Sequence, residues 1–394
     1  MSGQAINAFC TDFFEYDTPM MVHIKNKTVG IINRVFELII LSYIVFYGIL
    51  YEKGYQEYDE VRSAVATKLK GILYESNSSF GRITWDVADY VVPPLESNAF
   101  FVITSVVLTR MQVQKNCSEN PNIKAAWCEN DQDCQSKIGV ITPTGNGPFT
   151  GKCVQSATLP TRKVCEIYGW CPVEDDSKKN LFTFNDSEFF TVLIKNNIEF
   201  PKFNFRKRNI MDWYATDSEM GKCRWNPNDP LDKYCPIFEL GVIARGAGVE
   251  YSSLLTKGGI IKIIIDWNCD LDFSEDYCRP EYSFRWLDSG NFTVSVGFNF
   301  RYADHFFMRD NNTIRFYRNL YKAIGVHFMV EVRGRAGKFH LVNLLFNVGS
   351  GMALMGIASI LSDIVVLYFL KARKLYKDRK FQVAEVCPYE VEQL

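Results

Sequence analysis

Two long apolar segments lie near the ends of the chain, and shorter runs of alternating polar and apolar residues lie between them. The first segment, residues 29–51, is interrupted by Arg34 and Glu37, and the second, residues 341–370, contains one acid, Asp363. Each is long enough for a helix across the hydrocarbon core of a bilayer, which takes about 20 residues. A buried helix of a soluble protein is usually shorter, and a cleaved signal peptide begins earlier in the chain. The pattern therefore predicts two transmembrane helices that flank a large domain.

The part between the two segments carries the period-two alternation of β-strands. The strand-like runs are residues 61–71, 83–92, 100–113, 189–196, 235–244, 258–272, 293–303 and 321–334. Residues 117–171 differ, because they are polar, interrupted by Gly and Pro, and contain six Cys. So small a unit needs covalent cross-links, which predicts a disulfide-rich head subdomain. We expect a mainly β domain over residues 52–340.

Charges beside the apolar segments predict the orientation of the chain. Residues 371–380 contain six Lys or Arg and one Asp, and Lys25 and Lys27 precede the first segment. Loops rich in Lys and Arg stay on the cytoplasmic side. This places the tails 1–28 and 371–394 in the cytoplasm and the β domain outside the cell, as expected for a plasma-membrane protein that crosses the bilayer twice.

Cysteines and glycosylation motifs support an extracellular domain. Ten of the 12 Cys lie between the apolar segments: Cys117, Cys128, Cys134, Cys153, Cys165, Cys171, Cys223, Cys235, Cys269 and Cys278. Zinc ligation is the alternative to disulfides, but there is no C-x-x-C and no Cys/His pair at zinc-finger spacing. Five N-x-S/T motifs in the same region predict glycosylation at Asn77, Asn116, Asn185, Asn291 and Asn311.

Several classes of function find no support in the composition and motifs. The net charge of −1 gives no case for nucleic-acid binding. With four His and no G-x-S-x-G, H-E-x-x-H or Walker A motif, we predict that the chain is not an enzyme. Residues 334–339, GRAGKF, match only part of a phosphate loop and are interpreted as a flexible joint before the second membrane segment. Residues 266–272 lack the Gly of a calcium loop. No metal site is located, although His305 beside Asp304 is either a ligand pair or an ordinary surface histidine.

Basic residues within the strand-like runs predict an anion site. Lys68 and Lys70 are two positions apart, so they point to the same face of a strand, where their charges repel. Lys195, Arg301 and Lys322 lie on other runs. Each alone is typical of a solvated strand, but together they predict one cationic pocket for a compact polyanion such as a triphosphate.

The motifs together resemble the ionotropic purinergic receptors, the P2X family of ATP-gated cation channels. They are TKLKG at 67–71, the ten extracellular Cys, NFR at 299–301, Lys322, GRAGKF at 334–339 and YKDRK at 376–380. The resemblance covers residues 10–382. It implies a membrane-embedded homotrimer with two transmembrane helices and a β-rich ectodomain in each subunit. ATP would act as the agonist at three subunit interfaces and open a non-selective pore for Na⁺, K⁺ and Ca²⁺. Modulation by a divalent metal, Zn²⁺ or Mg²⁺, is plausible for such a receptor, and no cofactor is expected.

The resemblance also implies roles for individual residues. Lys68 and Lys70 would bind the phosphates, and Asn299, Arg301 and Lys322 would complete the phosphate site. Thr191 and Leu193 would contact the adenine, and Ile237 would cover it. Lys195 would support the site. The implied disulfides are Cys117–Cys171, Cys128–Cys153, Cys134–Cys165, Cys223–Cys235 and Cys269–Cys278. Tyr376 and Lys380 match a signal for retention at the cell surface.

The chain departs from the family pattern at three places. Thr18-Pro19-Met20 lacks the basic residue of a cytoplasmic Thr-x-Lys motif, which puts its role in desensitisation in doubt. Phe346 stands where the closed constriction commonly has Leu or Ile, so we expect a bulkier gate, or one near Ser350 or Ala353. Asn343 replaces a Pro, so the second helix is expected to begin differently. Asp363 is a candidate for helix assembly or for direct ion selection.

Three other functions remain open at this point. An ecto-nucleotidase has the same membrane topology but needs phosphate loops and metal-binding acids. A trimeric sodium or acid-sensing channel would leave the lysine cluster unexplained. A non-conducting adhesion or scaffold protein would have no need of Asp363.

Overall fold

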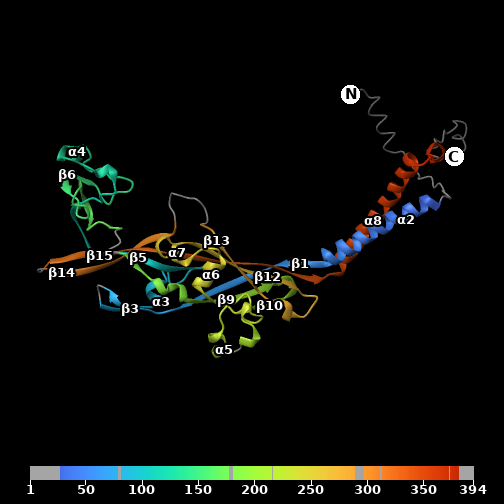
Figure 1. Cartoon of the computed structure of the whole chain (residues 1–394), viewed down its shortest axis with the longest axis horizontal. Helices are drawn as coiled ribbons and strands as arrows, with labels where there is room; N and C mark the ends of the chain where they lie inside the picture. Colours follow the sequence, from blue (N-terminus) through green and yellow to red (C-terminus); the bar gives the residue numbers. More distant parts are fainter. Residues whose placement is uncertain are drawn as a thin grey trace, which may run out of the picture. The chain divides into compact units, whose positions relative to one another are not determined.

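The chain forms two compact units in the computed structural model (Figure 1). Residues 27–78, 81–176, 181–214, 216–288, 297–310, 313–371 and 373–380 are described. One unit joins the two ends of the chain, 1–58 with 337–394, and the other is Asp59–Ala336.

Helices make up most of the terminal unit. They are α2 (Lys27–Ser42) with a π-helical continuation (Tyr43–Tyr51), α8 (Leu341–Ile364) with a π-helical continuation (Val365–Phe369), and α9 (Arg373–Lys380). The first two, 25 and 29 residues long with their continuations, are apolar enough to cross a membrane. The two apolar segments of the sequence are therefore helical, as predicted.

Polar and small residues join α2 to α8. Ser362 donates a hydrogen bond of 2.8 Å to the Asn33 side chain, and Gly351 lies so close to Ile44 that an added Cβ would be 3.1 Å from it. Asn343 donates 2.9 Å to the carbonyl of Gln56. α8 begins at Leu341, two residues before Asn343. A proline at position 343 could not make this hydrogen bond, because its side chain has no donor.

A nine-stranded sheet is the main layer of the β domain. Its central order is β13 (Glu281–Trp286), β12 (Gly259–Asp270), β15 (Thr313–Phe339), β5 (Ala99–Ser118), β7 (Lys163–Cys171) and β6 (Phe149–Gln155). β1 (Gln56–Glu60) and β14 (Asn299–Asp310) also pair with β15, and β8 (Leu181–Thr183) pairs with β5. Residues 334–339 are thus part of a long strand, so the prediction of a flexible joint there was wrong.

A four-stranded sheet packs against this layer through a shared apolar core. It consists of β2 (Arg62–Lys70), β9 (Thr191–Phe200), β10 (Phe205–Arg208) and β11 (Ile237–Glu239). Inward side chains such as Val192 and Ile194 of β9 and Ile265 of β12 belong to one buried cluster. A separate hairpin is formed by β3 (Leu73–Ser78) and β4 (Gly81–Trp85).

Short helices replace two of the predicted strands. The α-helices of this unit are α3 (Val87–Tyr90), α4 (Asp131–Gln135), α5 (Asp217–Lys222), α6 (Leu240–Gly246) and α7 (Tyr251–Lys257). Single 3₁₀ turns lie at Lys124–Ala126, Asn185–Phe189, Pro201–Phe203, Asp212–Tyr214, Asp232–Tyr234 and Glu275–Tyr277. The run 83–92 turns helical because Asp86 caps α3, and only three residues of the run 235–244 pair as β11. Short apolar runs do not distinguish a strand from a buried helix.

Five disulfides form with the pairing that the resemblance implied: Cys117–Cys171, Cys128–Cys153, Cys134–Cys165, Cys223–Cys235 and Cys269–Cys278. The Sγ atoms of Cys128, Cys134 and Cys165 lie within 4.8 Å of one another. Because each is already in a disulfide, none offers a thiolate to zinc. The domain boundaries assigned from the sequence, the head over 117–171 included, remain predictions.

Replacing Cys134 and Cys165 by serine should loosen residues 117–171 selectively. This bond closes a separation of 31 residues beside a core of only seven buried residues, and such a loop contributes about 3–4 kcal/mol. Peptide-resolved hydrogen exchange should show faster exchange there than in the wild type. Removing Cys223–Cys235 is the matched control and should leave the head unchanged. Unaltered exchange in the head of the first variant would contradict the expectation.

Candidate functional site

The outer face of the four-stranded sheet gathers six of the predicted site residues. Antiparallel register places Lys68 opposite Leu193, and Leu193 opposite Ile237, in one row across three strands. Lys70 and Thr191 are opposite each other in the next row, and Lys195 pairs with Ala66. Directly opposed residues point to the same side of a sheet. We call this surface the lysine face: Lys68, Lys70, Thr191, Leu193, Lys195 and Ile237.

The lysine face is open and its charge is not compensated. Lys68, Lys70 and Lys195 are exposed, whereas Thr191, Leu193 and Ile237 are half-buried. Within the described part of the chain, the three ammonium groups have no hydrogen-bond or ion-pair partner. Like charges held this close on one rigid sheet repel, so the face favours a bound anion.

The other predicted cations lie on the nine-stranded sheet. Arg301 of β14 is directly opposite Lys322 of β15, and Asn299 lies two residues from Arg301 on the same side of the strand. We call Arg301 and Lys322 the β14–β15 cation pair. The structure therefore places the predicted cations in two groups on two different sheets of the chain, and the single pocket that the sequence suggests for them stays a prediction.

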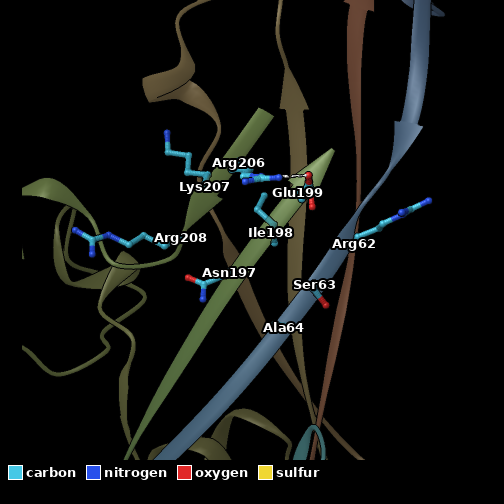
Figure 2. Close-up of a pocket in the computed structure, with 9 residues that line it drawn as sticks. All are labelled: Arg62, Ser63, Ala64, Asn197, Ile198, Glu199, Arg206, Lys207 and Arg208. Carbon is cyan, nitrogen blue, oxygen red and sulfur yellow. Dashed lines mark hydrogen bonds and ion pairs between the residues drawn. The ribbon is translucent and has the colours of Figure 1, made fainter. Parts of the chain in front are cut away.

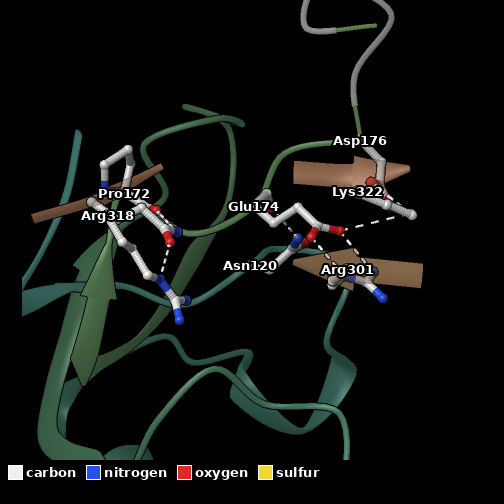
Figure 3. Close-up of polar contacts among 8 residues, drawn as sticks. Asn120, Pro172, Glu174, Asp176, Arg301, Arg318 and Lys322 are labelled. Carbon is white, nitrogen blue, oxygen red and sulfur yellow. Dashed lines mark hydrogen bonds and ion pairs between the residues drawn. The ribbon is translucent and has the colours of Figure 1, made fainter. Parts of the chain in front are cut away.

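Two acidic side chains form ion pairs with the β14–β15 cation pair (Figure 3). Arg301 donates from Nε and Nη2 to the Glu174 carboxylate at 2.6 and 2.8 Å. Lys322 donates 2.7 Å to Asp176 and lies 3.6 Å from Glu174. Glu174 holds the pKa of Arg301 above its ordinary value through the hydrogen bond, although burial opposes this shift. The paired carboxylates stand where an anionic ligand of these cations would bind.

The segment that carries the acids is fixed at two points. Gln112 of β5 accepts from Arg318 at 2.7 Å and donates 2.7 Å to the carbonyl of Pro172. Asn120 donates 3.0 Å to the backbone carbonyl of Glu174. Sequence reasoning missed Glu174 and Asp176. The acidic run at 174–176 is visible in the sequence, but its pairing with Arg301 spans 127 residues.

A pocket of about 660 Å³ lies at the opposite end of the four-stranded sheet (Figure 2). Arg62 is six residues from Lys68 along β2, which is about 20 Å in a strand. Arg206 is paired with Glu199, and Arg62, Lys207 and Arg208 point away from one another. These side chains do not converge, so the pocket assembles no anion site.

Three of the candidate pore residues lie on one exposed face of α8. Phe346, Ser350 and Ala353 follow the three- and four-residue spacing of a helix face, and Phe346 is 73% exposed. Ser350 donates 3.0 Å to the carbonyl of Asn347, whereas Asp363 is half-buried.

The remaining predicted residues concern glycosylation, surface retention and a metal ligand. Asn116 and Asn185 are exposed, which suits glycosylation. The side chains of Asn77, Tyr376 and Lys380 lie outside the described part, as do Thr18, Asn291 and Asn311 altogether. His305 stacks on Phe316 with ring centroids 5.3 Å apart, which favours the ordinary surface histidine over a ligand pair with Asp304.

Comparisons with known proteins give a consistent result. A family model described as ATP P2X receptor matches residues 14–383. Human P2X purinoceptor 5 is 42% identical over 383 residues, covering 96% of this chain and 84% of that protein. Mouse P2X purinoceptor 4 is 43% identical over 376 residues, covering 94% of each chain.

Solved structures show the same fold. A P2X receptor from the Gulf Coast tick, crystallised with ATP and Zn²⁺, superposes with a TM-score of 0.76 at 40% identity, covering 85% of this chain and all of that one. The chicken ATP-gated P2X7 receptor channel with the competitive antagonist TNP-ATP gives a TM-score of 0.73 at 36% identity, covering 87% of this chain and all of that one. These relatives are receptor channels rather than enzymes and give the ecto-nucleotidase alternative no support. The two membrane-length helices, the five-disulfide β ectodomain and these matches show that the chain belongs to the P2X receptor family of ATP-gated cation channels.

Proposed function

We propose that the chain assembles as a homotrimer and binds ATP between subunits. One subunit contributes the lysine face, and its neighbour contributes Asn299, Arg301 and Lys322. The observation that carries this proposal is the division of the cations between two sheets of one chain. Each group is a partial anion site, and closed rotational symmetry would bring the lysine face of every subunit against the β14–β15 cation pair of the next.

The two groups supply complementary parts of a nucleotide site. Lys68 and Lys70 are point charges for the polyphosphate, and Arg301 offers a fork of donors that suits bidentate contact with phosphate. Leu193 and Ile237 offer adjacent apolar side chains for the adenine, with the Thr191 hydroxyl beside them. Lys195 adds positive charge to the same face.

Gating follows from the ion pairs that Arg301 and Lys322 make with Glu174 and Asp176. A polyphosphate that binds Arg301 and Lys322 must displace Glu174 and Asp176, so occupancy exchanges contacts within a subunit for contacts between subunits. ATP then favours the state in which the two partial sites approach each other, by its difference in affinity for the two states. β15 continues into α8, so movement of this strand reaches the second membrane helix through the chain itself.

In the membrane, α2 and α8 span the plasma membrane and both termini lie in the cytoplasm. α8 lines a pore that conducts Na⁺, K⁺ and Ca²⁺ with little selectivity. Its gate lies at Phe346 or at the Ser350 and Ala353 positions of the same face. Asp363 serves helix assembly or ion selection. Divalent-metal modulation and surface retention through Tyr376 and Lys380 belong to the same proposal.

An interface site predicts that Lys68→Cys and Asn299→Cys can be cross-linked between subunits. Oxidising membranes from cells that express the double variant should give dimers and trimers on a non-reducing gel. Bound ATP should occupy the space between the two cysteines and reduce the yield. Each single variant is the control and should remain monomeric. A cross-link found only within one chain would contradict the interface site.

A further inference from the structure

One polar residue interrupts the buried side of β9, directly behind the lysine face. The inward row is Val192, Ile194, Asn196, Ile198 and Phe200, and all five are buried. Asn196 is 0% exposed. A buried amide costs free energy unless its donors and acceptors are paired, so its position in an apolar row needs a physical reason.

The Asn196 side chain links the two sheets. Trp267, fully buried on β12 of the nine-stranded sheet, donates from Nε1 to the Asn196 Oδ1 at 2.8 Å. Asn196 donates from Nδ2 to the carbonyl of Ala64 on β2 at 3.2 Å. One side chain thus joins both lysine-bearing strands to the main sheet.

Asn209, just after β10, holds the backbone of Asn196. The Asn196 amide donates 2.8 Å to the Asn209 side chain, and the Asn209 amide donates 3.0 Å to the Asn196 carbonyl. Asn209 Nδ2 donates 2.8 Å to the carbonyl of Ile194 and 3.0 Å to the Tyr282 hydroxyl. Burial raises the pKa of Tyr282, so the hydroxyl stays neutral. Because both the backbone and the side chain of Asn196 are hydrogen-bonded, the side chain is held in one orientation.

Trp267 in turn lies against β15. A Cβ added at Gly334 would be 2.1 Å from the Trp267 carbonyl oxygen, and Gly334 has a φ of +152° that other residues rarely adopt. The backbones are therefore in direct contact, and interiors this dense transmit displacement rather than absorb it. From Gly334, β15 runs to Phe339, and α8 begins at Leu341.

We propose that Asn196 and Trp267 are positioning residues that couple nucleotide occupancy to movement of β15. The inference rests on the proposed function for the assignment of the lysine face as half of the nucleotide site. Apolar contacts between the two sheets are non-directional, whereas the hydrogen bond from Trp267 to Asn196 requires one alignment of donor and acceptor. When ATP moves β9, this bond makes β12 follow, and β12 carries Gly334 with it.

The sharpest test replaces Trp267 by its benzothiophene isostere through nonsense suppression, which removes the N–H and keeps the shape. The ATP concentration for half-maximal current should rise about tenfold, within the roughly 5- to 150-fold range that is typical of coupling between two sites. The maximal response to a partial agonist should fall. The affinity of the closed channel for TNP-ATP, measured by displacement, should not change. Gly334→Ala should act in the same direction, and the combined variant should be no worse than the stronger single variant.

Trp225 provides the matched control. Its Nε1 donates 3.1 Å to the carbonyl of Lys233, outside the link between β9 and β12. Its isostere should leave gating unchanged. The proposal is overturned by an equal effect at Trp225, by additive effects of the Trp267 isostere and Gly334→Ala, or by equal changes in TNP-ATP and ATP affinity with unchanged partial-agonist efficacy. If ATP fails to displace TNP-ATP from the wild type, the proposed function fails instead.

Discussion

Lys70→Ala should raise the ATP concentration for half-maximal current by about 100-fold or more, because a desolvated charge contact to phosphate is worth about 2–5 kcal/mol. Lys70 is exposed, has no partner among the described residues and lies on a rigid strand beside Thr191. Whole-cell current on rapid ATP application would measure the shift.

Lys115→Ala is the control for charge alone. Lys115 is also an exposed strand lysine, but it lies on β5, away from the lysine face. Its removal should leave the ATP response within about twofold of the wild type, as for most surface substitutions. A normal response in Lys70→Ala would retain the channel and discard the phosphate assignment of the lysine face.

Glu174→Gln should act in the opposite direction and lower the half-maximal ATP concentration by about five- to tenfold. The Glu174 carboxylate is paired with Arg301 and Lys322 and therefore competes with phosphate for them. Glutamine keeps the shape but removes the charge, so ATP displaces a weaker partner. The Arg301 side chain is 49% exposed, so solvent screens this ion pair and limits the gain.

Glu199→Gln tests whether any lost ion pair has this effect. Glu199 accepts from Arg206 at 3.0 Å on the same domain, and neither residue belongs to the proposed site. The ATP response of this variant should match that of the wild type. If Glu174→Gln instead raised the ATP concentration for half-maximal current, the competition would be refuted. Glu174 would then orient Arg301 and Lys322 for ATP rather than compete with phosphate for them.

Local chemistry explains what could be predicted from the sequence. Length and apolarity alone indicate the two membrane helices, because a bilayer sets both requirements. The Lys-Leu-Lys pattern at 68–70 predicts two charges on one face, because a strand repeats every two residues. The helices α3 and α6 were read as parts of strands because a short apolar helix and a short apolar strand look alike in sequence.

Local patterns in the sequence are enough to predict the membrane class, the disulfide-rich β domain and a set of candidate phosphate-binding cations. How those cations are grouped on the sheets depends on the tertiary fold. Register placed Lys68 beside Leu193 and Ile237, and pairing across 127 residues placed Glu174 on Arg301. In the sequence, nothing distinguishes Asn196 from an ordinary strand residue, and its hydrogen bond from Trp267 is visible only in the fold. Such contacts join segments far apart in the chain, and their energies depend on burial and geometry that no local pattern contains.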